Sequence, residues 1–372
     1  MYKNKLFSLP TKIYFEDGII DSLKDILKEE NFNKALLIST PFFVRNGMAE
    51  KIKKENDIIV DVFSDFTPSP TLSEIENAAN KLKEIDADCV IALGGGTCID
   101  LAKFASAYVK VDGKIQDYFF GRKKLNGHLP LIAIPTTSGT GSEVTSVSAC
   151  TDDETLIKAP VNDKNFFPHI AIVDPLLTLS VPAYTTAITG MDALAHALEA
   201  YWGTPHREIS DLFATAAIKA IFENLEDAYL DAKGENVRAR REMSKGSLYA
   251  GIAFSQTRTA AVHGCSYPLS GNFGLDHGEA CAFTLDLFVL ENAKVDKRMD
   301  VLAKEVGFSS VEEMAEKIRY FKKKFNLKSS LKELGCKDSK KLAKECLDHP
   351  LYNNNPVKHS VDELAKLFEE LK

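Results

Sequence analysis

The chain has 372 residues, which is enough for about two domains of ordinary size. Its hydrophobic content of 45% and charged content of 27% are typical of a globular protein, and its formal net charge is −7. A chain with this acidic balance lacks the basic surface that binds nucleic-acid phosphates or an anionic membrane, so neither partner is expected. The sequence also contains no apolar run long enough for a transmembrane helix and no signal-peptide pattern at its start, which predicts a cytoplasmic location.

The cysteines do not form a recognisable framework. They are odd in number and scattered without a CxxC pair, which argues against disulfides or a zinc ribbon. We predict that each is a small buried hydrophobic residue in a reducing compartment. The seven are Cys89, Cys98, Cys150, Cys265, Cys281, Cys336 and Cys346.

Short apolar runs alternate with helical periodicity in the first half of the chain. An apolar spacing of three and four residues predicts a helix over 71–85. This alternation indicates βαβ units and therefore a parallel sheet. Residues 11–15 are interpreted as an edge strand or an exchanged arm. The predicted buried strands are 34–39, 58–63, 89–93, 129–134 and 170–173.

Strand-like runs disappear after about residue 178, and long helical patterns replace them. Asp174-Pro175 and Pro182 interrupt regular structure there, so we predict an α/β domain over 1–178 and an all-α domain over 179–372. The predicted helices are 187–202, 210–230, 237–256, 276–293, 297–306 and 311–325.

Two glycine-rich loops follow predicted strands. Gly94, Gly95 and Gly96 come directly after the strand 89–93, and a helix over 98–110 is predicted next. Glycines let backbone N–H groups approach a phosphate, and a helix N-terminus adds partial positive charge. A tight turn between strand and helix is the alternative for this loop alone. The second loop, Pro135–Glu143 (PTTSGTGSE), places hydroxyls and glycines at another strand end, which favours a dinucleotide lying across the edge of the sheet.

The segment Gly190–Ala200 (GMDALAHALEA) carries a possible metal site. Asp192 and His196 are four residues apart, so they lie on one face of a helix, surrounded by small and apolar residues. A surface hydrogen bond between the two is the alternative. Two further histidines, His263 and His277, each precede a glycine. One carboxylate and three imidazoles suit Fe²⁺ or Zn²⁺ with room for a substrate oxygen.

These motifs together resemble the iron-containing, group III alcohol dehydrogenases. The resemblance rests on Gly94–Lys103 (GGGTCIDLAK), Pro135–Glu143, Gly190–Ala200 and the two His-Gly pairs, which occur in the expected order along nearly the whole chain. It implies a Rossmann-like NAD(P)-binding domain followed by an all-helical metal-binding and catalytic domain. It also implies a homo-oligomer of two or more subunits.

The family's functional positions can be placed residue by residue. The resemblance assigns the metal to Asp192, His196, His263 and His277, with Fe²⁺ the expected ion and Zn²⁺ the alternative. The cofactor is NAD(P)(H), and its pyrophosphate is expected on the glycine turn and the helix that follows it. The expected cofactor-binding residues are Thr40, Gly94, Gly95, Gly96, Thr97, Asp100, Thr136, Thr137, Ser142 and Lys158.

Two positions depart from the family pattern. The family usually has another histidine four residues after the third metal ligand, and this chain has Tyr267 there. We predict Tyr267 as a catalytic residue in the proton route, and a hydroxyl chain through the cofactor ribose is the alternative. Many NAD-preferring members have an aspartate where this chain has Thr40. Because that carboxylate would repel a 2′-phosphate, its absence permits NADP(H) as well as NAD(H).

The segment around His263 resembles the subgroup that includes phosphonoacetaldehyde reductases. Arg258 lies five residues before His263, and a guanidinium is a good partner for a phosphonate or carboxylate. An arginine paired with a structural acid is the alternative. Phe254, Arg258 and Tyr267 are the predicted substrate residues, and the substrate is a small alcohol or aldehyde.

Two other functions remain open at this point. A related NAD- and metal-dependent lyase of the dehydroquinate synthase type would catalyse no net redox change. A non-catalytic metal-binding protein would need no cofactor loops. A redox assay separates the first of these from an alcohol dehydrogenase, and a cofactor titration tests the second.

Overall fold

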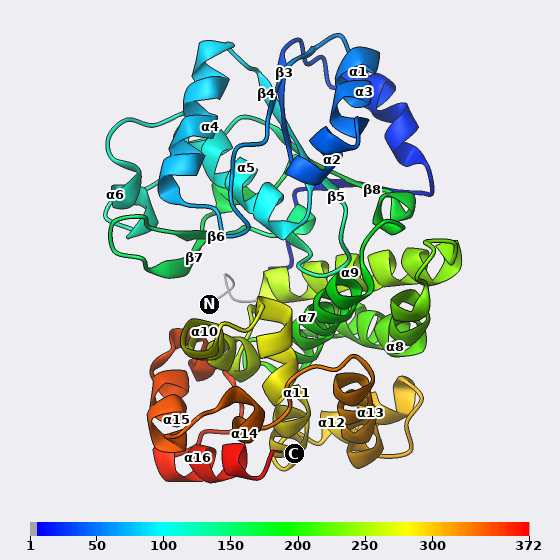
Figure 1. Cartoon of the computed structure of the whole chain (residues 1–372), viewed down its shortest axis with the longest axis vertical. Helices are drawn as coiled ribbons and strands as arrows, with labels where there is room; N and C mark the ends of the chain where they lie inside the picture. The colour runs from blue at the N-terminus through cyan, green and yellow to red at the C-terminus, as the bar shows by residue number, and fades with distance from the viewer. Residues whose placement is uncertain (1–5, 372) are drawn as a thin grey trace. The chain divides into compact units, whose positions relative to one another are not determined.

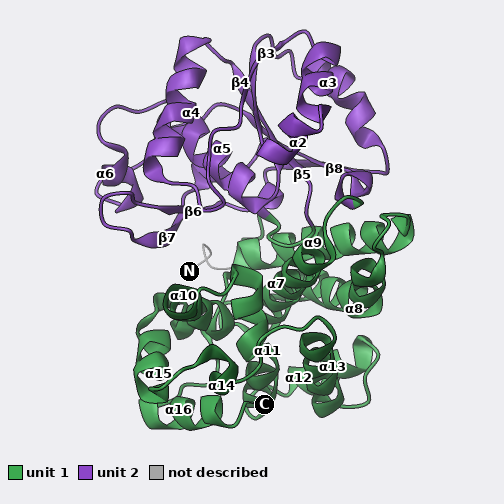
Figure 2. Ribbon diagram, in the orientation of Figure 1, with its two compact units in different colours: residues 1–8, 138–141, 179–372 green, residues 9–137, 142–178 purple. Residues whose placement is uncertain are grey.

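The computed structural model describes residues 6–371, which form two compact units (Figure 2). Residues 9–137 and 142–178 make the α/β unit, and residues 6–8, 138–141 and 179–371 make the helical unit. The predicted division into 1–178 and 179–372 thus differs from the compact units at two short segments. Ser8 is held by hydrogen bonds of 2.9 and 3.1 Å with Gln256, and the Ser138 hydroxyl lies 3.1 Å from that of Ser244.

The α/β unit contains a six-stranded sheet in the order β1-β8-β5-β4-β2-β3. Every neighbouring pair is parallel, as the alternating pattern predicted. The first strand, β1, lies at one edge beside β8, so residues 12–15 form an edge strand within this chain. The strands are β1 (Lys12–Phe15), β2 (Ala35–Ser39), β3 (Ile59–Phe63), β4 (Cys89–Gly94), β5 (Leu131–Pro135) and β8 (Ile170–Val173).

Helices cover both faces of this sheet, which explains why the central strands β2, β4, β5 and β8 are fully buried, whereas the edge strands β1 and β3 are partly exposed and include Lys12 and Asp61. Alternate strand residues enter different cores: Leu36 and Val90 pack with α4 and α5, whereas Leu37 and Ile91 pack with α1 and α3. Figure 1 shows α4 and α3 on different sides of the strands. The helices of this unit are α1 (Leu23–Glu29), α2 (Pro41–Arg45), α3 (Met48–Glu55), α4 (Leu72–Glu84), α5 (Gly96–Tyr108) and α6 (Ile115–Phe119).

One element of this unit was not predicted. An antiparallel hairpin is formed by β6 (Val147–Thr151) and β7 (Lys158–Asn162), and five residue pairs join its strands. Pro160 interrupts the pattern of β7, and both strands lack a run of large apolar residues, which is the signal on which the prediction relied.

The helical unit contains no strand among its described residues, as predicted. One large core joins its helices around α7, and no helix between residues 6 and 371 is long and apolar enough to cross a membrane. The prediction missed α10, whose interior contains Pro268, and the short C-terminal helices. The helices are α7 (Ala183–Trp202), α8 (Glu208–Leu230), α9 (Val237–Thr257), α10 (Ala261–Phe273), α11 (His277–Ala293), α12 (Arg298–Glu305), α13 (Val311–Lys324), α14 (Leu331–Leu334), α15 (Ser339–Asp348) and α16 (Val361–Glu369).

Candidate metal centre and cofactor loops

The helix α7 presents three polar side chains on one buried face. Asp192, His196 and Glu199 are spaced by four and three residues, so they lie one above the other along the helix. They are only 3%, 6% and 0% exposed. Since buried polar groups need partners, this face must meet polar atoms from other elements.

Three imidazoles surround one oxygen atom of Asp192. Its Oδ1 lies 3.6 Å from His196 Nδ1, 3.5 Å from His263 Nε2 and 3.6 Å from His277 Nε2. Two ligand atoms that are each about 2.1 Å from a tetrahedral metal ion lie about 3.4 Å apart. Each of the three imidazole nitrogens that the sequence singled out therefore lies at a separation from Asp192 Oδ1 that suits a shared cation.

Three of these four ligand atoms have no hydrogen-bond partner. Asp192 Oδ1, His196 Nδ1 and His263 Nε2 are all buried and make no hydrogen bond within the described part of the chain. An unsatisfied buried polar atom costs about 1–3 kcal/mol. A divalent cation would satisfy all three at once, so the donor set fits a metal ion.

The protonation states of the α7 pair also suit a metal ion. Burial alone would raise the pKa of the Asp192 carboxyl, but the neighbouring imidazoles outweigh it and hold that pKa below its usual range. Burial lowers the pKa of His196 to about 3. At neutral pH the pair therefore offers a carboxylate and a neutral imidazole, which are the forms that bind metals.

Glu199 is a functional residue that the sequence reasoning missed. Its Oε2 lies 2.5 Å from His263 Nδ1, and its Oε1 accepts hydrogen bonds from the backbone N–H groups of Val262 (2.6 Å) and His263 (3.3 Å). It thereby holds the start of α10 and turns His263 Nε2 toward Asp192. In metal sites, a carboxylate commonly accepts a hydrogen bond from the histidine ring nitrogen that does not bind the metal. The available signal was an acidic residue three positions after His196, on the helix face that also carries Asp192.

His277 is the most accessible of the four predicted ligands. Its side chain is 39% exposed, whereas those of Asp192 and His263 are 4% and 5% exposed. The cluster is therefore open on the side of His277. Phe254 covers His196 instead, with ring centroids 4.2 Å apart and an interplanar angle of 17°.

Tyr267 has an aromatic partner that the sequence did not suggest. Its ring stacks on that of His349, with centroids 4.5 Å apart and an interplanar angle of 11°, and its centroid lies 6.2 Å from that of His277. The position where the resemblance implies a histidine is thus tyrosine here, and a histidine from the end of α15 lies beside it. The sequence reasoning gave His349 no role.

Arg258 lies in an unusual backbone conformation. It is exposed and follows the end of α9 with φ 66° and ψ 176°, a region that is nearly restricted to glycine. Backbone strain of this kind costs about 1–3 kcal/mol and is concentrated at functional sites.

The predicted cofactor loops meet at one edge of the sheet. Thr40 directly follows β2, Gly94 ends β4, and Thr136 directly follows β5, so all three lie at the carboxyl ends of adjacent parallel strands. A Cβ on Gly94 would lie 2.6 Å from Thr40 Cγ2, and one on Gly95 would lie 3.1 Å from Thr137 Oγ1. The sheet order reverses between β2 and β4, which is where open α/β sheets bind ligands.

Several predicted cofactor residues are engaged inside the unit. The Ser142 hydroxyl donates to Asp100 Oδ1 at 2.6 Å and accepts from Lys103 Nζ at 2.7 Å. The Thr97 hydroxyl donates to the carbonyl of Pro68 at 2.8 Å. These hydrogen bonds hold the loops in shape. Lys158 on β7 differs from these residues, because its side chain is exposed.

Lys103 is the centre of this network and was missed as an individual residue. Its side chain is fully buried, and Nζ also donates to Thr145 Oγ1 at 3.0 Å and to the carbonyl of Val147 at 2.7 Å. Burial lowers the pKa of Lys103 to about 8. It ties the helix after the glycine turn to the end of the second loop.

Glu143, at the end of the second loop, provides a pH-dependent prediction. Burial raises its pKa from 4.5 to about 7, and the residue is 3% exposed. The folded state therefore holds a proton that the unfolded state loses, so this contribution to stability is complete below pH 4.5 and is lost as the pH rises to 7. Glu143→Gln, which keeps the neutral shape, should gain about 2–3 kcal/mol over the wild type between pH 4.5 and pH 8.

Urea unfolding of both proteins at the two pH values measures this difference. Glu50→Gln, at an exposed position on α3, controls for the lost charge and should show no such pH dependence. A Glu143→Gln effect of the same size at both pH values would contradict the prediction.

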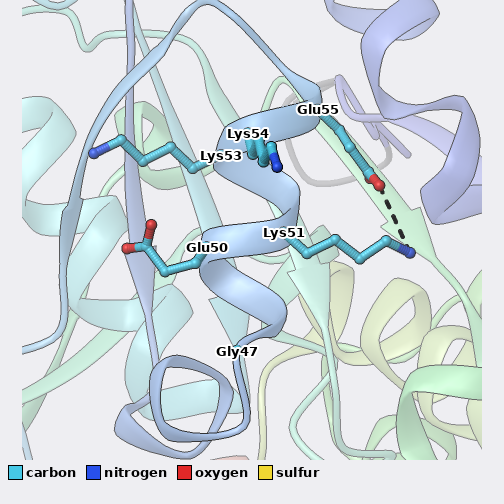
Figure 3. A pocket seen from close by; sticks show the side chains of 6 residues that line it. All are labelled: Gly47, Glu50, Lys51, Lys53, Lys54 and Glu55. Carbon is cyan, nitrogen blue, oxygen red and sulfur yellow. Dashed lines mark ion pairs between the residues drawn. The ribbon is translucent and has the colours of Figure 1, made fainter.

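A hollow over α3 is not a second candidate site. Figure 3 shows that lysines and glutamates on this short helix line it, and Lys51 and Glu55 form an ion pair of 3.9 Å across one turn. An exposed helix face with mixed charges needs no ligand.

Comparison with known proteins identifies the family. Residues 10–175 match the model of the iron-containing alcohol dehydrogenases, and residues 186–371 match that of the C-terminal part of the same family. The chain belongs to the iron-containing alcohol dehydrogenase family. The resemblance inferred from the four motifs is thus confirmed, as is the two-part fold.

Similar members of this alcohol dehydrogenase family cover the whole chain. The structure of sulfoacetaldehyde reductase from Bifidobacterium kashiwanohense in complex with NAD⁺ has a TM-score of 0.94 and 37% identity, covering 98% of this chain and 97% of that one. The NAD-dependent methanol dehydrogenase of Bacillus methanolicus is 31% identical, covering 98% of each. The NADPH-dependent butanol dehydrogenase of Clostridium saccharobutylicum is 30% identical, covering 98% of this chain and 97% of that protein.

This family membership establishes the class of reaction. The chain is an oxidoreductase, a metal-dependent alcohol dehydrogenase or aldehyde reductase that works with a nicotinamide cofactor. The Asp192 cluster lies in the part matched by the C-terminal family model, and both glycine-rich loops lie in the part matched by the first.

Proposed function

We propose that this enzyme reduces a small aldehyde with an anionic group, such as a phosphonate or sulfonate, using NADH or NADPH and Fe²⁺. The observation that carries the catalytic part is the convergence of three imidazole nitrogens on one buried carboxylate oxygen at 3.5–3.6 Å. The anionic substrate is supported by Arg258 and by similarity to a sulfoacetaldehyde reductase. We further propose a cytoplasmic homo-oligomer of two or more subunits, with Zn²⁺ as the alternative metal.

The proposed metal ligands are Asp192, His196, His263 and His277. A divalent cation held there supplies Lewis acidity that polarises a carbonyl and favours alkoxide character. Glu199 fixes the orientation of His263, and Phe254 covers His196, so these parts of the site exclude water. The half-exposed side of His277 is the proposed approach for the substrate.

The proposed cofactor site lies at the carboxyl edge of the sheet. The backbone of Gly94–Gly96 and the start of α5 would bind the pyrophosphate, because free N–H groups and the helix dipole favour anions there. Thr40, Thr97, Thr136, Thr137 and Lys158 would surround the rest of the dinucleotide. Asp100 and Ser142 would act by holding the loops, since they bond to each other and to Lys103.

The proposed proton route runs through Tyr267. Its ring centroid lies 6.2 Å from that of His277, and the imidazole of His349 stacks on the Tyr267 ring, so both groups can carry a proton near the cluster. Together they would provide what the usual histidine provides in other members of the family.

Arg258 gives the sharpest test of the substrate class. Removing a charged hydrogen-bond donor costs about 1.5–3 kcal/mol, so Arg258→Ala should raise KM for phosphonoacetaldehyde or sulfoacetaldehyde roughly 10–100-fold. Propanal should be turned over with nearly unchanged KM. In Arg258→Gly the same loss should accompany a gain of about 1 kcal/mol in the free energy of unfolding, because glycine relieves the strained backbone.

Arg238→Ala, at an exposed position in the first turn of α9, controls for the loss of positive charge. Equal effects of Arg258→Ala on charged and neutral aldehydes would exclude the anion role and leave the alcohol dehydrogenase assignment intact. The assay follows NADH and NADPH oxidation by Fe²⁺-loaded protein prepared without oxygen, so it also measures the coenzyme preference. Bound metal and cofactor without turnover of any aldehyde would favour the lyase alternative.

A further inference from the structure

Cys281 lies beside the four proposed metal ligands. It follows His277 by four residues on α11, so the two side chains share one helix face, and it is fully buried. Its Sγ lies 3.9 Å from His277 Nε2. The ligand atoms of Asp192, His263, His277 and Cys281 all lie within 4.8 Å of one another, and His196 does not belong to this set.

A second observation indicates that the group around Cys281 binds a ligand. Asp192 Oδ1 and His263 Nε2 belong to side chains that are more than nine-tenths buried, and neither atom has a hydrogen-bond partner within the described residues. The sulfur therefore lies next to two buried polar atoms that have no hydrogen-bond partner among the described residues. A thiol that only fills space, as we predicted for every cysteine, would not need this position.

The two helices present their side chains in the same way. On α7, Asp192 and His196 are four residues apart, and on α11, His277 and Cys281 are four residues apart. His263 on α10 completes the group. The ligand atoms of Asp192, His263, His277 and Cys281 lie within 4.8 Å of one another, whereas His196 approaches the group through Asp192 Oδ1, 3.6 Å from its Nδ1.

The packing of α11 on α7 fixes the second pair. A Cβ at Gly278 would lie 2.0 Å from the carbonyl oxygen of Ile188, so only glycine allows this contact. The close approach holds the first turn of α11, and with it His277 and Cys281, against the helix that carries Asp192.

We propose that Cys281 is a further ligand of the metal ion. The proposal rests on the metal centre of the proposed function. Its Sγ–H proton passes to solvent, and the thiolate sulfur forms the bond to the ion. A soft sulfur ligand beside one carboxylate and imidazoles raises the relative affinity for Zn²⁺ and Co²⁺. Metal selectivity of this enzyme is thus set partly by a residue outside the family's usual ligands.

The absorption spectrum of the Co²⁺-loaded, oxygen-free enzyme tests this proposal. A cobalt–thiolate bond produces a strong charge-transfer band in the near ultraviolet, which carboxylate and imidazole ligands do not. The wild type should show this band with one Co²⁺ bound per chain, and Cys281→Ala should lose it. Cys346→Ala is the matched control, because it also removes a fully buried helical sulfur, and it should keep the band.

Each alternative outcome has a definite meaning. A wild type that binds one Co²⁺ without the band, or a Cys281→Ala variant that keeps the band, would overturn the role of Cys281 and leave the metal centre standing. Failure of the wild type to bind Co²⁺, measured as metal content per chain, would overturn the metal centre and this proposal together. Cys281→Ser repeats the test with a side chain of similar size if the alanine variant does not fold.

Discussion

Replacing Asp192 with asparagine is expected to remove the bound metal and lower aldehyde reduction by more than about 100-fold. Its Oδ1 lies 3.5–3.6 Å from one nitrogen of each of the three imidazoles. An amide of the same shape loses the charge that balances the cation, and the loss of a single electrostatic contact in an active site already costs about 10²–10³ in rate. The fold should survive, because size and burial are unchanged. Metal content per chain and turnover with Fe²⁺ in excess measure the two effects.

Glu199→Gln is expected to lower metal affinity and activity less than Asp192→Asn does. Glu199 touches His263 rather than the site of the ion, and such outer partners contribute roughly 10–100-fold to metal affinity or activity. We therefore expect a smaller loss than in Asp192→Asn. Asp227→Asn on the exposed face of α8 removes the same charge as a control and should have no effect. An Asp192→Asn enzyme that keeps its metal and full turnover would overturn the proposed metal centre.

Replacing Gly278 with alanine is expected to destabilise the helical unit by about 3 kcal/mol or more. The new Cβ would lie 2.0 Å from the carbonyl oxygen of Ile188 and 2.7 Å from its carbonyl carbon, and these backbone atoms cannot rotate away. The structure can only respond by moving α11 away from α7. That movement would also separate His277 from Asp192, so the folded fraction should bind metal more weakly.

Gly271→Ala on α10 is the control for this substitution. A Cβ there has no heavy atom within 4 Å, so the higher helix propensity of alanine should leave stability unchanged or raise it by up to about 1 kcal/mol. Urea unfolding of both variants measures the stabilities, and a metal titration of the folded proteins measures the affinities. Equal stabilities of the two variants would show that the contact between α7 and α11 adjusts freely.

The sequence alone determined the sheet type and singled out the residues of the proposed metal site. Buried parallel strands are apolar on both faces, so they appear in the sequence as continuous apolar runs. Such a run can be recognised from neighbouring residues alone. The glycine turn, the hydroxyl-rich loop and the Asp192–His196 pair are also local patterns, because a helix places residues four apart on one face. His263 and His277 were singled out by the glycine that follows each, and the family resemblance assigned them to the same ion, because no local spacing connects them to α7.

Only the tertiary structure decided which distant groups meet. Glu199 and His263 are 64 positions apart, and Lys103 reaches across 39–44 positions to the second loop, so neither contact follows from any periodicity. The same holds for Cys281 beside the proposed metal ligands and for His349 stacked on Tyr267. The hairpin β6–β7 and the proline-containing helix α10 were missed because surrounding contacts, rather than their own residue preferences, stabilise them. Local residue patterns thus determine most helices, strands and loops, whereas long-range packing determines which side chains contact one another.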